Sequence, residues 1–275
     1  MTNTWREYNI YDERNLDDEN DLIDDEDYAS SFNLFDEIQE GKEEMLEFSF
    51  PLRGEEKNCQ DQAIQITLKG FRDYSQSTGM AVWLGSEVLS YFLVQNSNLV
   101  RNKSVLEVGA GLGLAGIVSH HLDAKVTLTD GDTLVLKDYL SYNAKRNQKG
   151  SDIACDQLIW GTQGQPEESS PLTLFREKHG SFDVILAADC VYMPQSVQPF
   201  WQTIDALANK DNGCLIYVME ASSQAPPGKI FELARHFKFV WSSMEVSIPS
   251  DNDAVPDSTT PQRHEVLIFQ RQNGR

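Results

Sequence analysis

Positive charge is scarce in this sequence. Its 275 residues include 23 lysines and arginines against 43 aspartates and glutamates, which gives a formal net charge of −20 at pH 7. A chain that follows the phosphates of a nucleic acid needs an excess of cations, so this charge argues against a nucleic-acid binder. It favours a basic protein partner instead, because opposite charges attract over long range.

Cysteine and long apolar runs are scarce too. The four cysteines (Cys59, Cys155, Cys190 and Cys214) include no Cys-x-x-Cys pair, and three of them lie in apolar runs. This spacing predicts reduced, buried thiols in an intracellular protein and no metal site. No apolar run approaches the roughly 20 residues that span a membrane, and the polar, acidic N-terminus is unlike a signal peptide. We expect a monomeric protein of the cytoplasm, with the nucleus as a second location.

The negative charge is concentrated at the N-terminus. Residues 1–47 contain 17 acidic residues against Arg6, Arg14 and Lys42, so this segment carries −14 of the total charge of −20. Such acidic blocks repel themselves and usually stay disordered. Interspersed aromatic residues are typical of a segment that docks on a basic partner. We therefore separate an acidic tail, residues 1–44, from a folded domain, residues 45–275, and leave open whether the tail docks or only aids solubility.

The folded domain begins with a predicted β-hairpin and continues as an α/β unit. Residues 46–50 and 63–68 alternate between apolar and polar side chains, as paired strands do. From residue 104 to residue 237, short apolar runs alternate with helix-length segments, which predicts parallel strands with helices on both faces of the sheet. The last two apolar runs would close the fold as an antiparallel pair. We expect one domain, with the hairpin at about 45–70 and the core at about 78–271.

Two predicted elements lie in the middle of the core. Residues 133–147 are predicted to form a helix with Leu134, Leu136, Tyr139 and Leu140 facing the sheet. The polar residues 162–170 are predicted to form a loop, and no helix is predicted between that loop and the strand at 182–188.

The most informative stretch is residues 104–130, SVLEVGAGLGLAGIVSHHLDAKVTLTD. It predicts a strand, a glycine turn, a helix and a second strand that ends in Asp130, which is the first half of a nucleotide-binding crossover. Gly109 and Gly111, with Ala110 between them, let the backbone turn sharply and approach a ligand that a Cβ would block. Asp130 suits a ribose, because a carboxylate accepts hydrogen bonds from two vicinal hydroxyls.

Two cofactors fit such a turn. The spacing Gly111-x-Gly113-x-x-Gly116 matches the dinucleotide fingerprint of NAD enzymes, but the strand ends earlier, at Gly109. Counted from Gly109, the motif places Glu107 at the end of the strand. A carboxylate is unfavourable beside a pyrophosphate and favourable beside a cation, so we favour S-adenosylmethionine, which carries an ammonium and a sulfonium. A solvated strand end is the structural alternative for Glu107.

Further motifs fall at the carboxyl ends of the predicted strands, where open α/β sheets bind their ligands. They are Val126–Asp130, Leu158–Gly161 and Phe182–Tyr192, and a further motif, Ala81-Val82-Trp83, lies where the first predicted helix begins. With the glycine turn they resemble the seven-strand S-adenosylmethionine-dependent methyltransferases, specifically the methyltransferase-16 group of protein lysine methyltransferases. The resemblance covers about residues 78–269. It implies a Rossmann-like, seven-stranded, mostly parallel sheet and methyl transfer to a lysine of a non-histone protein.

The same resemblance assigns roles to the residues at the strand ends. In such enzymes two tryptophans and the alanine before an Asp-x-x-Tyr motif line the donor pocket, which here implies Trp83, Trp160 and Ala188. The motif itself supplies the candidate catalytic pair, Asp189 and Tyr192. Asp189 would position the lysine ammonium, and Tyr192 would accept a hydrogen bond or form a wall of the channel.

Structural alternatives accompany these roles. Asp189 suits a cap for the helix that begins near Pro194, and Tyr192 and Trp83 suit core positions. Two features depart from the family pattern, namely the long acidic N-terminus and the presence of Asp132. The second acid leaves open which carboxylate would meet the ribose.

Other functions stay open. The residues predicted to bind the methyl donor do not exclude another acceptor, such as arginine, histidine, an N-terminus or a small molecule. A non-catalytic binding module would keep the fold, although it would not need the intact glycine turn with its two acids. An NAD oxidoreductase is the weakest hypothesis. As a partner we expect a protein with a basic, lysine-bearing region, and neither a nucleic acid nor a membrane.

Overall fold

The computed structural model describes residues 42–52, 62–72, 78–162, 164, 170–219, 225–249 and 262–272. The predicted acidic tail lies almost entirely outside these residues, so its two interpretations stay predictions. None of the helices in the described part of the chain combines the length and the apolar composition of a membrane span. Three of the four cysteines lie in that part, and all three are free thiols.

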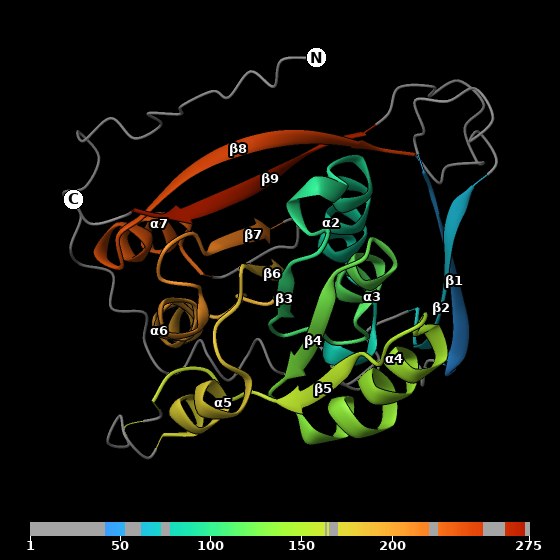
Figure 1. Ribbon diagram of the computed structural model, residues 1–275, viewed down its shortest axis with the longest axis horizontal. Coiled ribbons are helices and arrows are strands. Elements are labelled where there is room, and N and C mark those ends of the chain that lie inside the picture. The colour runs from blue at the N-terminus through green and yellow to red at the C-terminus, as the bar shows by residue number, and fades with distance from the viewer. Residues whose placement is uncertain are drawn as a thin grey trace, which may run out of the picture.

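A seven-stranded sheet forms the centre of the domain, with the strand order β5-β4-β3-β6-β7-β9-β8 (Figure 1). All neighbours pair in parallel except β9, which runs antiparallel to both β7 and β8. The structure confirms the predicted Rossmann-like, mostly parallel sheet and its antiparallel C-terminal pair. The strands are β3 (Ser104–Glu107), β4 (Lys125–Asp130), β5 (Ala154–Gln157), β6 (Val184–Ala188), β7 (Cys214–Val218), β8 (Phe239–Ile248) and β9 (Gln262–Arg271).

Helices cover both faces of this sheet because its central strands are apolar on both sides. In β6, Val184 and Leu186 belong to one buried cluster, whereas Ile185 and Ala187 belong to a second one. Successive side chains of a strand point to opposite faces, so such a run needs a cover on each face. The first cluster includes α2 (Leu84–Gln95), α3 (Leu114–His121) and α4 (Ser141–Asn147), and the second includes α5 (Pro171–His179), α6 (Val197–Leu207) and α7 (Pro227–His236).

The predicted N-terminal hairpin is present and lies beside α4 (Figure 1). Two asparagines of α4 bind the backbone of its second strand. Asn147 accepts the N–H of Thr67 at 3.0 Å and donates to the Thr67 carbonyl at 2.9 Å. Asn143 binds Lys69 in the same way, at 2.7 and 3.1 Å, so α4 takes the place of a third strand. The two strands are β1 (Glu44–Pro51) and β2 (Ala63–Gly70).

The helical run predicted at residues 133–147 is present, but its middle is a π-helix, Val135–Leu140. The prediction for Leu134 is wrong: this residue is 51% exposed, and Val135 is buried instead. The other three predicted positions are buried or packed against the core. A π turn holds more residues than the 3.6 that the prediction assumed, so it shifts the buried face. Asp132 fixes this phase, because its Oδ1 accepts the Leu134 and Val135 N–H groups.

Helix α5 was not predicted, because it follows directly on the polar loop. Local signals for it exist at its start. Ser170 Oγ accepts the Thr173 N–H at 3.2 Å, and Pro171 occupies the first turn, where its missing N–H costs nothing. The serine cap and the proline are signals for the start of a helix, and the prediction did not use them.

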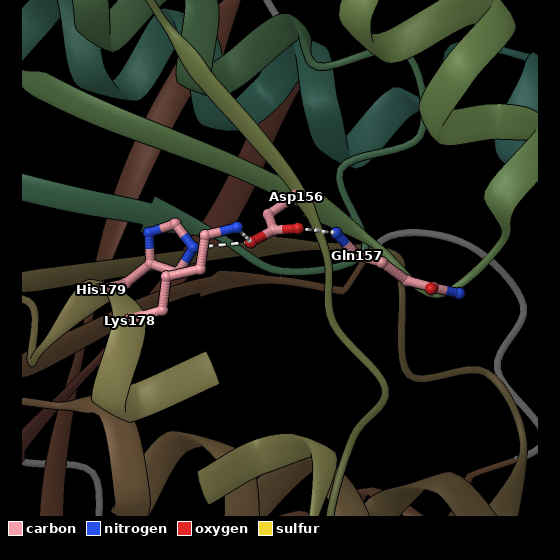
Figure 2. A network of polar contacts seen from close by, with 4 residues as sticks. All are labelled: Asp156, Gln157, Lys178 and His179. Atoms are coloured by element: carbon pink, nitrogen blue, oxygen red, sulfur yellow. Dashed lines mark hydrogen bonds and ion pairs between the residues drawn. The ribbon is translucent and has the colours of Figure 1, made fainter. Parts of the chain in front are cut away.

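The other end of α5 is tied to the edge strand β5 (Figure 2). Asp156 Oδ2 lies 2.6 Å from Lys178 Nζ and 2.7 Å from His179 Nε2, and Oδ1 accepts the N–H of Gln157. Burial raises the pKa of Asp156, but the hydrogen bonds from Lys178, His179 and the Gln157 N–H, with the charge of Lys178, outweigh burial and leave the pKa below its usual value. This network fixes α5 against the edge of the sheet.

Candidate active site

All ten residues that the sequence singled out line one cavity of about 610 Å³. The cavity lies at the carboxyl ends of β3, β4 and β6. The strand order reverses between β3 and β6, which is where open α/β sheets bind their ligands. The ten residues are Trp83, Glu107, Gly109, Ala110, Gly111, Asp130, Trp160, Ala188, Asp189 and Tyr192.

The glycine turn needs its glycines for backbone conformation and for space. Gly109 and Gly111 have φ angles of +60° and +53°, which other L-residues rarely adopt. A Cβ on Gly109 would lie 2.7 Å from Cys190 Cβ and 3.2 Å from the ring of Trp160. A Cβ on Gly111 would lie 3.1 Å from the carbonyl oxygen of Gly79. The turn therefore brings bare main chain against several other segments of the cavity wall.

Glu107 ends β3 with only 2% of its surface exposed, which excludes the alternative of a solvated strand end. Its Oε2 accepts the N–H of Gly116 in α3 at 2.8 Å. Burial raises the pKa of Glu107 to about 8, the Gly116 hydrogen bond opposes this rise, and the charge of Asp130 adds to it. A cation in the cavity would favour the ionised carboxylate and lower this pKa again.

Asp130 ends β4 between two backbone donors. Its Oδ2 accepts the N–H of Gly111 at 3.0 Å, and its Oδ1 accepts the N–H of Asp132 at 2.9 Å. Burial raises the pKa of Asp130, and these hydrogen bonds partly oppose the rise. Asp132 also lines the cavity, but it is exposed and caps the helical run that follows. Because only Asp130 binds the glycine turn, its geometry favours it as the ribose contact.

Two tryptophans line the cavity from different elements. Trp83 directly precedes α2, and its Nε1 donates to the carbonyl of Thr78 at 2.8 Å. Trp160 follows β5, and its ring meets Phe200 of α6 edge to face with the centroids 5.4 Å apart. Both tryptophans are only partly buried, so neither is purely a core residue.

Asp189 follows β6 with a φ of +49°, a left-handed conformation that aspartate tolerates better than most residues. Its Oδ2 accepts the N–H of Gly85 at 2.8 Å. Asp189 therefore caps the start of α2, while Met193 occupies the N-cap position of the short helix that begins at Pro194. Uncommon backbone conformations in a cavity wall are typical of functional positions.

Tyr192 lies at the exposed side of the cavity, with 43% of its surface accessible, which excludes a core position. Its hydroxyl lies 3.5 Å from Oγ1 of Thr78. This contact joins two segments that are 114 residues apart in the sequence. Tyr192 is therefore placed to bound the entrance.

The cavity wall is acidic. Among the described residues that line it, four are carboxylates and none is a lysine, arginine or histidine. The sequence did not point to Thr78, Gly79, Ser86 or Gln195, which also line the cavity. They belong to no motif, and their closeness to Trp83 or Tyr192 along the chain was the one signal available.

The sheet order, the glycine turn and the acidic cavity define a Rossmann-like ligand-binding domain. A family model described as lysine methyltransferase matches residues 62–231, which is more than half of the chain. This protein belongs to that lysine methyltransferase family, which confirms the resemblance seen in its motifs.

Named relatives agree with the family. The protein-lysine methyltransferase METTL21E of Bos taurus is 36% identical over 168 residues, covering 59% of this chain and 51% of that protein. The protein N-lysine methyltransferase METTL21A of Danio rerio is 33% identical over 140 residues, covering 49% and 58%. This chain thus spans little more than half the length of these two relatives. The histone-arginine methyltransferase METTL23 of Rattus norvegicus is 26% identical over 201 residues, covering 70% and 82%.

Among solved structures, a putative S-adenosylmethionine-dependent methyltransferase from Streptococcus mutans is similar with a TM-score of 0.50. It is 14% identical, and the match covers 81% of this chain and 55% of that one. This likeness bears on the fold alone.

Proposed function

We propose that this chain transfers a methyl group from S-adenosylmethionine to the side-chain nitrogen of a lysine in another protein. The observation that carries the proposal is the cavity at the reversal of strand order. Its described wall holds four carboxylates, two tryptophans and no cationic side chain. Such a wall suits a cationic donor beside a cationic acceptor, because both carboxylates and aromatic faces attract cations. Membership in the lysine methyltransferase family supports the same reaction.

The glycine turn and its two acids fit the donor. Gly109 and Gly111 let the main chain approach it closely, and Asp130 is held where it can accept hydrogen bonds from ribose hydroxyls. The buried Glu107 would face the positive charge of the donor, which favours ionisation of its carboxyl group. When bound, the donor supplies a methyl group on a positively charged sulfur, which becomes a neutral thioether once a nitrogen takes that methyl.

Asp189 and Tyr192 fit the acceptor. A lysine arrives protonated, with an ordinary pKa of about 10.4, and its nitrogen must lose a proton before its lone pair is available. In our proposal Asp189 attracts and orients the ammonium, and water takes the proton, so no dedicated base is required. Tyr192 and the two tryptophans would confine the lysine side chain and limit the entry of water.

A second acceptor deserves a place in the test because of one comparison. The rat relative described as a histone-arginine methyltransferase aligns over a longer part of this chain than the two lysine methyltransferases do. A carboxylate such as Asp189 can also receive a planar guanidinium through two parallel hydrogen bonds. Arginine is therefore the alternative acceptor.

The experiment is methyl transfer from labelled S-adenosylmethionine into a lysate of cells that lack the protein, with the labelled residue mapped by mass spectrometry. We expect label on a lysine, and an Asp189→Ala variant that binds the donor but leaves no label serves as the control. Label on an arginine would support the second acceptor. If no lysate is labelled and the donor does not raise the melting temperature, the proposal is wrong, and stabilisation by NADH would instead favour a dehydrogenase.

The partner and the location belong to the same proposal. The net charge of −20 supports an acceptor protein with a basic region around its lysine. We further propose that one chain acts alone, in the cytoplasm and secondarily in the nucleus. Light scattering of the active protein and imaging of a tagged chain test these two points, and an obligate dimer or a secreted chain would contradict them.

A further inference from the structure

Gly85, the second residue of α2, lies directly against the carboxyl group of Asp189. A Cβ added to Gly85 would lie 2.5 Å from Oδ2, 2.7 Å from Cγ and 3.1 Å from Oδ1 of Asp189. These three are the nearest atoms, and all belong to the far end of one side chain. A methyl group at this position would therefore displace the carboxyl group of Asp189 before it disturbed any backbone.

The same glycine also holds the carboxylate. Its N–H donates to Asp189 Oδ2 at 2.8 Å across 104 residues of sequence. The first N–H groups of a helix have no acceptor within the helix, and the positive end of the helix dipole lies there, so this contact favours a negative group. The backbone of Asp189 adds a second constraint, because its left-handed φ of +49° limits the directions in which the side chain can project from the main chain.

We propose that Gly85 is a positioning residue for Asp189. Its missing side chain lets α2 approach the carboxylate, and its N–H fixes the angle at which the carboxylate meets the acceptor nitrogen. The inference deepens the proposed methyl transfer and rests on it for the role of Asp189. It predicts that Gly85 acts on the acceptor step through Asp189 alone and leaves donor binding unaffected.

The chain contains a matched control in Gly228. Gly228 is the second residue of α7, as Gly85 is of α2, and both helices follow an N-cap residue with extended backbone. A Cβ added to Gly228 meets nothing within 4 Å. An alanine changes helix propensity alike at both positions, so only the contact with Asp189 distinguishes them.

The first test compares the two glycine-to-alanine variants. Gly85→Ala should lower kcat by roughly 10- to 100-fold, the size expected from a misplaced reacting group, with the affinity for S-adenosylmethionine within about two-fold of the parent. Gly228→Ala should leave kcat and donor affinity unchanged, and its melting temperature should rise slightly because alanine is the better helix former. If Gly85→Ala leaves kcat unchanged, or weakens donor binding as much as it slows transfer, the inference is wrong.

A double-mutant cycle tests whether the effect passes through Asp189. In an Asp189→Ala background, adding Gly85→Ala should have no further effect on the residual rate, because the group it displaces is already gone. An equal loss in both backgrounds would show that Gly85 acts by another route and would overturn the inference.

A readout without catalysis separates this inference from the proposed function. At one fixed pH, the amide proton of Gly85 should resonate downfield, as expected for a donor to a carboxylate, and it should move upfield in Asp189→Ala. If the chemical shift of the Gly85 amide proton is the same with and without the Asp189 carboxylate, the positioning role is wrong. If the chemical shift of the Gly85 amide proton depends on Asp189 but no acceptor is methylated, the proposed function is wrong, while the contact between Gly85 and Asp189 is still supported.

Discussion

The donor half and the acceptor half of the proposed active site are built in different ways. The proposed donor half, from Glu107 to Asp130, comes from one short stretch of chain. Its Glu107 carboxylate accepts the N–H of Gly116, 9 positions away, and its Asp130 carboxylate accepts the N–H of Gly111, 19 positions away. The acceptor half joins Asp189 to Gly85 and Tyr192 to Thr78, across 104 and 114 positions. The donor half is also more deeply buried, since Glu107 is 2% exposed and Tyr192 is 43% exposed. In the proposed site, a fixed local motif would thus hold the general donor, while the rim that would meet a particular acceptor depends on tertiary contacts.

The largest effect should come from Asp189→Ala. If Asp189 belongs to the acceptor half alone, kcat should fall by at least about 100-fold, while donor affinity stays within about three-fold. The lost cap of α2 should cost about 1 kcal/mol of stability, which thermal unfolding measures separately. Equal losses of activity and donor affinity would show that Asp189 also contributes to donor binding and does not belong to the acceptor half alone.

Asp130→Ala should act on the donor half. Hydrogen bonds to a charged group contribute about 1.5–3 kcal/mol each, so the affinity for S-adenosylmethionine should fall roughly 100-fold by calorimetry. The matched control is Asp132→Ala, which removes a helix cap beside the same cavity and should lower stability by about 1 kcal/mol with little change in donor affinity. If the two variants exchange these effects, Asp132 is the ribose contact.

Glu107→Gln should change how stability depends on pH. The pKa of Glu107 is raised from its ordinary 4.5 to about 8 in the folded protein. The folded state therefore keeps a proton that the unfolded chain releases, and Glu107 makes the protein less stable as pH rises through this window. Between about pH 5.5 and 8, the ligand-free parent should lose several degrees of melting temperature relative to the variant. If the melting temperatures of the parent and of Glu107→Gln differ by the same amount at all pH values, the carboxyl group of Glu107 is not buried and protonated as inferred.

The smallest effect should come from Tyr192→Phe. If the ring forms a wall of the acceptor channel, the phenylalanine keeps the wall and loses only the long contact with Thr78, so kcat/KM should change less than about three-fold. Tyr192→Ala removes the wall and should raise KM for the protein acceptor about ten-fold at unchanged donor affinity. Equal losses in both variants would assign the role to the hydroxyl group.

Local patterns account for what the sequence predicted. The apolar runs gave the sheet, and the spacing of Glu107, Gly109 and Asp130 gave the donor half, because these features depend on residues that are close in the chain. The π-helix was not predicted because it breaks the 3.6-residue period on which the prediction for Leu134 relied. The contact of Asp189 with the start of α2 was not predicted because no local pattern brings residues 85 and 189 together. The position after a predicted strand singled out Asp189 and Tyr192, and the resemblance to a family supplied their expected roles.

The asparagine pair on α4 has a consequence for hydrogen exchange. The N–H groups of Thr67 and Lys69 face α4 rather than β1, and both donate to asparagine side-chain oxygens, at 3.0 and 2.7 Å. Exchange with solvent requires these amides to open, so both should exchange slowly, as amides in the middle of a sheet do. Their protection would report the docking of α4 on the hairpin rather than pairing between strands, and replacing Asn143 and Asn147 should release the two amides while β1 and β2 remain paired.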